Sequence, residues 1–360
     1  MNRTEPDARM VREALLSWYD ENRRELPWRG TRDPYQIWVS ETMLQQTRVE
    51  TVKRYYTRFL EVFPDAAALA AATREQVLKA WEGMGYYRRA VLLHEGAQQL
   101  MHAMQGQFPR TRDALLQIRG IGEYTAAAIA SIAFQEPVAA MDGNAFRVYA
   151  RILGEERAVE QADTRRTLTE WGNACALGPR PGDLNQAVMD LGNGPCRAGV
   201  PLCDTCPLRK ICAAHQRGTQ DTIPRHRKKT PPKEISYALA LLLGSENDIG
   251  MVKRQEQLLK DLWVFPLLEN VKGEICVTSA LMEKGIQVTG KVTELGSYRH
   301  VFTHRIWKMT VYGVSSFSGT MEGLQMIPLE AIHGQPIPSA MRGALEQMEI
   351  WLSGNADRKE

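Results

Sequence analysis

Apolar residues between Met10 and about Phe134 recur every three or four positions, which is the period of an amphipathic α-helix. Short polar residues stand where such helices could begin, at Asp65, Thr73 and Asp113, and the four residues from Thr73 have the form of a capping box. The pattern predicts that this part of the chain is almost entirely helical.

The helical pattern ends before residues 216–233, which read QRGTQDTIPRHRKKTPPK. This segment has few apolar residues, three prolines and a basic run, the composition of a solvated linker. We therefore expect a helical domain over residues 1–215, a linker over 216–233 and a second domain over 234–360.

The second domain has a different pattern of apolar positions. Short runs rich in β-branched and aromatic residues are separated by Gly, Asn and Ser, which is typical of strands and turns. The predicted strands lie at 235–243, 275–281, 291–298 and 307–317. The expected fold is therefore a mainly α N-terminal region followed by an α+β domain.

Composition limits the class of protein. With 44% hydrophobic and 24% charged residues, the chain is neither disordered, collagen-like nor a coiled coil. It lacks an apolar run long enough to span a membrane and an export signal at its N-terminus, so we expect a cytoplasmic protein. Residues 1–233 carry 33 Lys and Arg against 27 Asp and Glu, whereas residues 234–360 carry 12 against 15. The basic surplus of the first part is compatible with a polyanionic partner without establishing one.

Four cysteines fall within 17 residues, at Cys196, Cys203, Cys206 and Cys212. This clustering is unlike a secretory disulfide framework. Four thiolates in one short loop can enclose either a 4Fe-4S cluster or a tetrahedral zinc ion. The spacing alone favours the iron–sulfur cluster and leaves zinc as the alternative.

A second motif, LLQIRGIGEYTA, runs from Leu115 to Ala126 and precedes an apolar helical run. Gly120 and Gly122 bracket one apolar residue, as in a tight turn between two helices. The missing side chains would let the backbone amides approach a phosphate at the start of the second helix. Such a hairpin would hold DNA without reading its sequence, although an ordinary turn between helices has the same pattern.

Two carboxylates stand in distinctive surroundings. Glu41 lies among large apolar residues, where burial would raise its pKa and keep it protonated, although an exposed glutamate at a helix start has the same pattern. Asp142 precedes Gly143 and Asn144 at the predicted start of a helix, where it can act as an N-cap. Two carboxyls of unequal pKa could supply one proton donor and one negative charge.

Together these features resemble the helix-hairpin-helix (HhH-GPD) superfamily of iron–sulfur DNA glycosylases. Within that superfamily, the chain is similar to the A/G-specific adenine DNA glycosylase (MutY) family. The similarity rests on PWR at 27–29, SETMLQQT at 40–47, GMGYYRRA at 83–90, GIGEYT at 120–125 and MDGNAFRV at 141–148.

The resemblance implies an enzyme that removes adenine mispaired with 8-oxoguanine or G in duplex DNA, with no membrane association and as a monomer. Glu41 would protonate the extruded adenine, ionised Asp142 would stabilise the sugar cation, and Tyr124 and Asn144 would orient these two carboxyls. The implied adenine pocket comprises Arg24, Leu26, Trp28, Arg29, Gln186 and Met189. The implied DNA contacts are Gln46 and Tyr86 as wedge residues, Thr47 beside Gln46, and Gly120 and Gly122 in the hairpin.

The resemblance continues into the second domain, which looks like the Nudix-like lesion-recognition domain of the same family. The glutamate-rich catalytic box of Nudix hydrolases is absent from it. The implied lesion-reading residues are Phe302, Thr303 and His304. Thr303 departs from the serine usual in the family, because it adds a methyl group and restricts χ1 while retaining the hydroxyl.

Tyr124 also bears on the type of reaction. Related glycosylase/lyases have at this position a lysine that forms a Schiff base, which a phenol cannot do. The sequence therefore predicts a monofunctional glycosylase. Two alternatives remain open here: an endonuclease III-like pyrimidine glycosylase/lyase, and a non-catalytic protein that binds damaged DNA.

Overall fold

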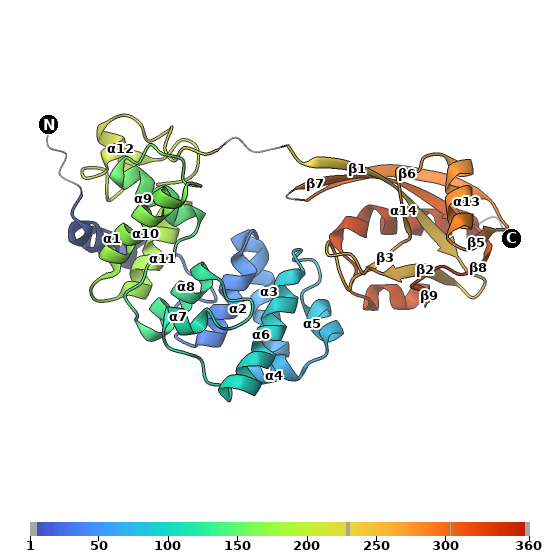
Figure 1. The fold of residues 1–360 in the computed structure, drawn as a ribbon, viewed down its shortest axis with the longest axis horizontal. Coiled ribbons are helices and arrows are strands. Elements are labelled where there is room, and N and C mark those ends of the chain that lie inside the picture. The colour runs from blue at the N-terminus through green and yellow to red at the C-terminus, as the bar shows by residue number, and fades with distance from the viewer. Residues whose placement is uncertain (1–5, 228–230, 303, 357–360) are drawn as a thin grey trace. The chain divides into compact units, whose positions relative to one another are not determined.

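The computed structural model of the protein describes residues 6–227, 231–302 and 304–356. The chain forms two compact units, coloured from blue to red along the chain in Figure 1. Unit 1 comprises Met1–Arg74 and Arg89–Lys228, and unit 2 comprises Glu75–Arg88 and Lys229–Glu360. No helix in the described residues is long and apolar enough to cross a membrane.

Unit 1 is built from helices. They are α1 (Ala8–Asn22), α2 (Pro34–Leu44), α3 (Val49–Val62), α4 (Ala66–Ala71), α6 (Arg88–Met104), α7 (Arg112–Leu115), α8 (Glu123–Phe134), α9 (Gly143–Leu153), α10 (Ala162–Ala176), α11 (Pro181–Asn193) and α12 (Ala213–Gln216). Helix α5 (Arg74–Ala80) lies in the segment grouped with unit 2. Described residues 6–227 contain no regular strand, which confirms the helical prediction.

The structure confirms one predicted helix N-cap, Asp65, and contradicts another, Asp113. Asp65 caps α4, since its side chain accepts a hydrogen bond from the Ala68 amide at 2.8 Å. The prediction for Asp113 was wrong, because Thr111 occupies the N-cap of α7 and Asp113 lies inside the first turn. The Thr111 hydroxyl, two positions earlier, accepts a hydrogen bond from a backbone amide of the first turn that has no partner within the helix. The sequence alone did not show which of the two residues would be the N-cap.

The core of unit 1 brings α1, α9, α10 and α11 together around fully buried Leu15, Tyr149 and Leu184. The polar segment expected to be a solvated linker contacts unit 1 at several points, and its Ile223 is only 1% exposed. The Ile223 carbonyl oxygen accepts a hydrogen bond from Arg151 Nε at 2.8 Å. Residues 216–223 are therefore held against unit 1 and are not wholly solvated.

Unit 2 contains a mixed sheet with the strand order β3-β2-β1-β7-β6, in which β4 pairs with β1 and β9 with β2. Strands β1 and β7 are parallel, and the other pairs in this sheet are antiparallel. The strands are β1 (Lys233–Leu243), β2 (Asp248–Lys253), β3 (Trp263–Val264), β4 (Leu267–Glu269), β6 (Val292–Val301), β7 (Arg305–Val314) and β9 (Leu324–Pro328). Strands β5 (Ile286–Val288) and β8 (Phe317–Gly319) form a second, two-stranded sheet.

Helices cover both faces of the larger sheet. Along β1, Leu239 and Leu241 face a core shared with α14 (Arg342–Ala356), whereas Ala240 and Leu242 face a core shared with α13 (Glu274–Glu283). Because both faces are covered, β1 is apolar on both sides, which explains the continuous run ALALLL. Figure 1 shows β1 and β7 side by side in this sheet.

The strand predicted at 275–281 is instead part of helix α13. Val277 and Leu281 are four residues apart, so in a helix they point to the same side, and both are completely buried. Ile275 is 83% exposed. Packing of one helical face against the sheet therefore outweighs the strand propensity of the β-branched residues.

Candidate functional site

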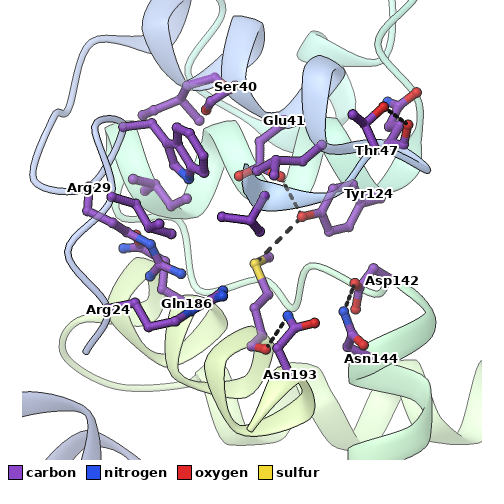
Figure 2. A pocket seen from close by; sticks show the side chains of 18 of the residues that line it. Arg24, Arg29, Ser40, Glu41, Thr47, Tyr124, Asp142, Asn144, Gln186 and Asn193 are labelled. Carbon is purple, nitrogen blue, oxygen red and sulfur yellow. Dashed lines mark hydrogen bonds between the residues drawn. The ribbon is translucent and has the colours of Figure 1, made fainter. Parts of the chain in front are cut away.

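A cavity of about 370 Å³ opens in unit 1 between α2, α8, α9 and α11 (Figure 2). It is lined by residues of five segments that are far apart in the sequence. All six residues of the expected adenine pocket line it, as do the four expected catalytic residues and two of the expected DNA contacts. These residues are Arg24, Leu26, Trp28, Arg29, Gln186 and Met189, then Glu41, Tyr124, Asp142 and Asn144, then Gln46 and Thr47. The fold thus gathers in one place the site residues expected from several separate motifs.

Glu41 forms part of the α2 wall of the cavity and is 5% exposed. Burial raises the pKa of its carboxyl, while a hydrogen bond from Tyr124 and the charge of Arg29 oppose that rise. Tyr124 Oη donates to Glu41 Oε2 at 2.5 Å, and Figure 2 shows this contact across the cavity. Glu41 is therefore held inside the helix, not at an exposed helix start, and its neutral acid form is favoured.

Asp142 forms the α9 wall and caps that helix. Its Oδ1 accepts a hydrogen bond from the Ala145 amide at 2.7 Å, and its Oδ2 accepts from Asn144 Nδ2 at 2.9 Å. The pKa of Asp142 is raised above its ordinary value, because burial outweighs these donors, which lower it. The positive end of the α9 dipole favours the ionised form. The surroundings of Asp142 therefore offer an anion more direct stabilisation than those of Glu41.

Arg147 fixes the position of the Asn144 side chain by a hydrogen bond. Arg147 Nη2 donates to Asn144 Oδ1 at 2.8 Å and to the Gly192 carbonyl at 2.6 Å, and its Nε donates to the Cys196 carbonyl at 3.0 Å. A Cβ atom at Gly192 would lie 2.8 Å from the Asn144 Cβ, so glycine permits this close approach of α9 and α11. The sequence analysis did not single out Arg147, because its partners are up to 49 residues away.

Asp190 is a second residue that the sequence analysis missed. It is 4% exposed, and its Oδ1 lies 3.0 Å from both Arg24 Nε and Arg29 Nη2. Arg29 also donates to the Tyr19 hydroxyl at 2.7 Å. One buried carboxylate thus positions two arginines of the cavity wall. An Asp inside the apolar stretch AVMDL of α11 was the available signal, since a buried charge requires a partner.

The glycines of the expected hairpin play different structural roles. Gly120 has φ +84°, and a Cβ there would lie 2.9 Å from Leu92, so only glycine fits without a shift. Gly122 is the N-cap of α8 and forms no side-chain cap, and the space around it is open. The first amides of α8 are therefore not covered by a capping side chain, as an anion-binding helix start requires.

Several predicted site residues lie away from the cavity lining. Gly120 and Gly122 are not among its residues, and neither are the four loop cysteines. Tyr86 has φ +50° and is 49% exposed, and it belongs to the segment grouped with unit 2. Its role as a wedge stays a prediction.

The four cysteines follow α11, and the buried Arg151 organises their loop. Its guanidinium donates to Cys196 Sγ at 3.4 Å and to the carbonyl oxygens of Arg197 and Gly199 at 2.8 and 3.0 Å. Burial raises the pKa of Cys206 to about 12, and the charges of the other three loop cysteines add to that rise. The four sulfurs therefore lie within electrostatic range of one another.

No three His, Cys, Asp or Glu side chains in the described ranges are gathered closely enough to hold a single metal ion. Four thiols in one loop are the donor set of either a tetrahedral metal ion or an iron–sulfur cluster. Arg151 donates a hydrogen bond to the sulfur of one of them, Cys196.

In unit 2, Phe302 lies in an aromatic group. Its ring contacts His300 and Trp307 edge-on, with centroid separations of 4.6 and 4.9 Å. Phe302 also donates its amide to the Arg305 carbonyl, and the side chain of His304 is exposed. Thr303 lies outside the described residues.

Family models match both parts of the chain. Residues 39–174 match the HhH-GPD superfamily of base excision DNA repair proteins, and residues 238–347 match the NUDIX domain. The thermostable thymine-DNA glycosylase is a structural neighbour at TM-score 0.53 and 28% identity, covering 59% of this chain and 97% of that one. A DNA complex of endonuclease III, at TM-score 0.50 and 22% identity, shows the same fold over 60% of this chain and 99% of that one.

The sequence relatives are more specific. Adenine DNA glycosylase of Homo sapiens is 33% identical and covers 92% of this chain and 72% of its own length. The Mus musculus enzyme is 35% identical, and the match covers 97% of this chain and 79% of that enzyme. The enzyme of Buchnera aphidicola (subsp. Acyrthosiphon pisum) is 33% identical, and the match covers 81% of this chain and 83% of that enzyme. Together with the two matched domains, these relatives show that the chain belongs to the adenine DNA glycosylase family, the HhH-GPD base excision repair enzymes that hydrolyse N-glycosyl bonds.

Proposed function

We propose that this enzyme removes adenine opposite 8-oxoguanine or G in duplex DNA and does so without cleaving the strand. The observation that carries the proposal is the pairing of two differently held carboxyls in one cavity. Glu41 is buried and hydrogen-bonded to Tyr124, whereas Asp142 is capped by Ala145 and Asn144. We propose residues 1–215 as the excision domain, 216–233 as the linker and 234–360 as the lesion-reading domain.

The reaction follows from the two protonation states. The duplex must first extrude the adenine, which costs unstacking free energy. Neutral Glu41 then donates its proton to the base, and the bonding electron pair leaves with the adenine. Ionised Asp142 stabilises the positive charge that develops on the sugar. Water adds to the sugar carbon and returns a proton to Glu41, so the products are free adenine and an abasic site.

The absence of lyase activity is proposed from Tyr124. Its hydroxyl occupies the hairpin position where the related lyases carry the Schiff-base lysine, and here it donates to Glu41. Burial raises the pKa of Tyr124 well above its ordinary value, so the phenol remains a neutral donor. Its role is therefore to orient the acid.

The four loop cysteines are proposed to hold a 4Fe-4S cluster, which would brace the loop that follows α11. The measurement is iron and sulfide content, with charge-transfer absorbance, in the wild type, Cys203→Ser and Cys276→Ser. We expect loss of the cluster in Cys203→Ser alone, because Cys276 lies outside the loop and is exposed. Binding of one zinc ion and no iron would contradict the proposal.

Phe302, Thr303 and His304 are proposed to read the base opposite the adenine. The aromatic support from His300 and Trp307 holds Phe302 at the surface of unit 2. We expect Thr303→Ala to lower the preference for 8-oxoguanine over G without abolishing excision. Unchanged discrimination would contradict the assignment.

The overall test uses single-turnover incubation with adenine opposite 8-oxoguanine, G or T, and with thymine glycol opposite adenine. Each product is divided, and only one half receives alkali. We expect alkali-dependent cleavage with the first two duplexes alone. Cleavage without alkali would overturn the monofunctional assignment, and activity on thymine glycol would favour a pyrimidine glycosylase. Tight binding with no base release would indicate a DNA-damage-binding protein.

A further inference from the structure

The turn that follows α2 is held by Arg89, a residue with no role assigned above. Arg89 lies in the first turn of α6, and its Nη1 donates to the carbonyl oxygens of Thr42 and Met43 at 2.9 Å each. The same nitrogen donates to the Gln45 carbonyl, and Nη2 donates to Thr47 Oγ1 at 3.0 Å. One guanidinium thus contacts the end of α2 and both residues that flank Gln46.

Gln46 has an uncommon backbone conformation at this turn. Its φ is +57°, in the left-handed region that residues other than glycine rarely adopt, and its side chain is exposed. Such a conformation costs free energy and persists where the surroundings over-determine it. The Arg89 contacts on either side supply that constraint, and Gln45 Nε2 adds a hydrogen bond to Thr125 Oγ1 of α8 at 3.3 Å.

The chemistry of the contact requires arginine. The last carbonyls of a helix have no partner within the helix, and a cation near them is favoured by the helix dipole. The planar guanidinium can reach the Thr42, Met43 and Gln45 carbonyls and the Thr47 hydroxyl together. A lysine ammonium is a point charge with a different reach, so it cannot reproduce this set of contacts.

We infer that Arg89 is a positioning residue that holds Gln46 in the conformation needed to enter the base stack, and holds it at a set place relative to Glu41. The inference rests on the proposed function, in which adenine is extruded. Glu41 and Thr42 are adjacent on α2, so the contact that sets the turn also sets the end of the helix that carries the acid. Arg89 acts through this segment and not on the substrate.

The test measures base extrusion separately from bond cleavage by working in the Asp142→Asn background, where we expect base release to be roughly 10²–10³-fold slower. A duplex with 2-aminopurine beside the mispaired adenine reports unstacking by its fluorescence at saturating enzyme. We expect Arg89→Lys to reduce the extrusion equilibrium about tenfold, since hydrogen bonds to a charged group are lost. Arg166→Lys is the matched control, because Arg166 is an exposed arginine on α10.

A double-mutant cycle with Gln46→Ala shows whether Arg89 acts through the turn. If it does, Arg89→Lys has little further effect on extrusion once the Gln46 side chain is gone. Additive losses, or full extrusion by Arg89→Lys, would overturn the inference. Circular dichroism at the assay temperature verifies that each variant is folded.

The inference and the proposed function fail in different ways. If the wild type releases no adenine from any duplex, the proposed function fails. If the wild type excises adenine and Arg89→Lys extrudes it equally well, only the inference fails.

Discussion

Helices α2 and α9 each place one carboxyl on the wall of the cavity in unit 1, but the groups that surround the two carboxyls differ. The α2 wall buries Glu41 among apolar residues and gives it a phenol as donor. The α9 wall places Asp142 at a helix start, with a backbone amide and the Asn144 side chain as donors. We therefore propose that the same functional group donates a proton on one wall and stabilises positive charge on the other.

The largest expected effect comes from removing the proton donor. Glu41→Gln should lower the single-turnover excision rate by roughly 10²–10⁴-fold, because a positioned general acid contributes that much. The amide can still accept the Tyr124 hydrogen bond, so the fold should persist. Glu50→Gln, on the exposed side of α3, is the control. A Glu41→Gln rate within tenfold of the wild type would show that Glu41 is not the acid.

Asp142→Asn tests the other wall. The amide oxygen can still accept the Ala145 amide, but the negative charge is lost, so excision should fall by roughly 10²–10³-fold. Affinity for the mispaired duplex should change little, as measured by fluorescence anisotropy. Asp163→Asn, on the exposed face of α10, should leave both quantities unchanged. If excision survives in Asp142→Asn, the sugar cation is stabilised by another group.

Asn144→Ala sharpens the comparison, because it removes one donor from Asp142 and leaves the carboxyl in place. The rate should fall about tenfold, the typical loss for one hydrogen bond to a charged group. The pKa of Asp142 should rise, moving the acidic limb of the pH–rate profile to higher pH. Asn22→Ala, on α1, is the control. An unmoved acidic limb would mean that Asn144 does not act on Asp142.

The pH–rate profile compares the two walls in the wild type. Burial raises the pKa of Glu41 above its ordinary value of 4.5, so the acid should be lost, and the rate should fall, as pH rises through that raised pKa. The rate should also fall at low pH, as Asp142 takes up a proton. The expected profile is a bell whose basic limb disappears in Glu41→Gln. A profile without a basic limb would contradict a buried acid.

The smallest expected effect is on stability. With the folded pKa of Glu41 above the unfolded one, the unfolded state ionises first, so the free energy of unfolding decreases as pH rises from 4.5 through the folded pKa. Glu41→Gln should remove this loss and stabilise the protein by about 1 kcal/mol at pH 8. Urea unfolding at pH 5 and pH 8 measures it. Equal destabilisation of Glu41→Gln at both pH values would argue against the ionisation of Glu41.

Some of the candidate site could be predicted from local sequence. Asp142 and Asn144 are two residues apart, and their hydrogen bond follows from the turn that starts α9. Gly120 is required by the backbone of the hairpin, and the four cysteines lie in one loop. Where the chemistry depends on neighbours in sequence, the residue types and their spacing were sufficient to indicate it.

Local sequence patterns predicted the secondary structure only in part. They identified the helical region and three of the four predicted strands of the second domain. They were wrong for residues 275–281, because the burial of Val277 and Leu281 against the sheet determines that helix. They were also wrong for Asp113, because Thr111 was a competing cap.

By itself, the sequence determined which chemical groups are available, how regularly the apolar residues recur and which turns need glycine. Only the tertiary structure decided which groups share an environment. Asp190 meets Arg24 across 166 residues, and Tyr124 meets Glu41 across 83. The physical reason is that periodicity and turn geometry act over a few residues. Desolvation and charge pairing depend on the segments that folding brings together.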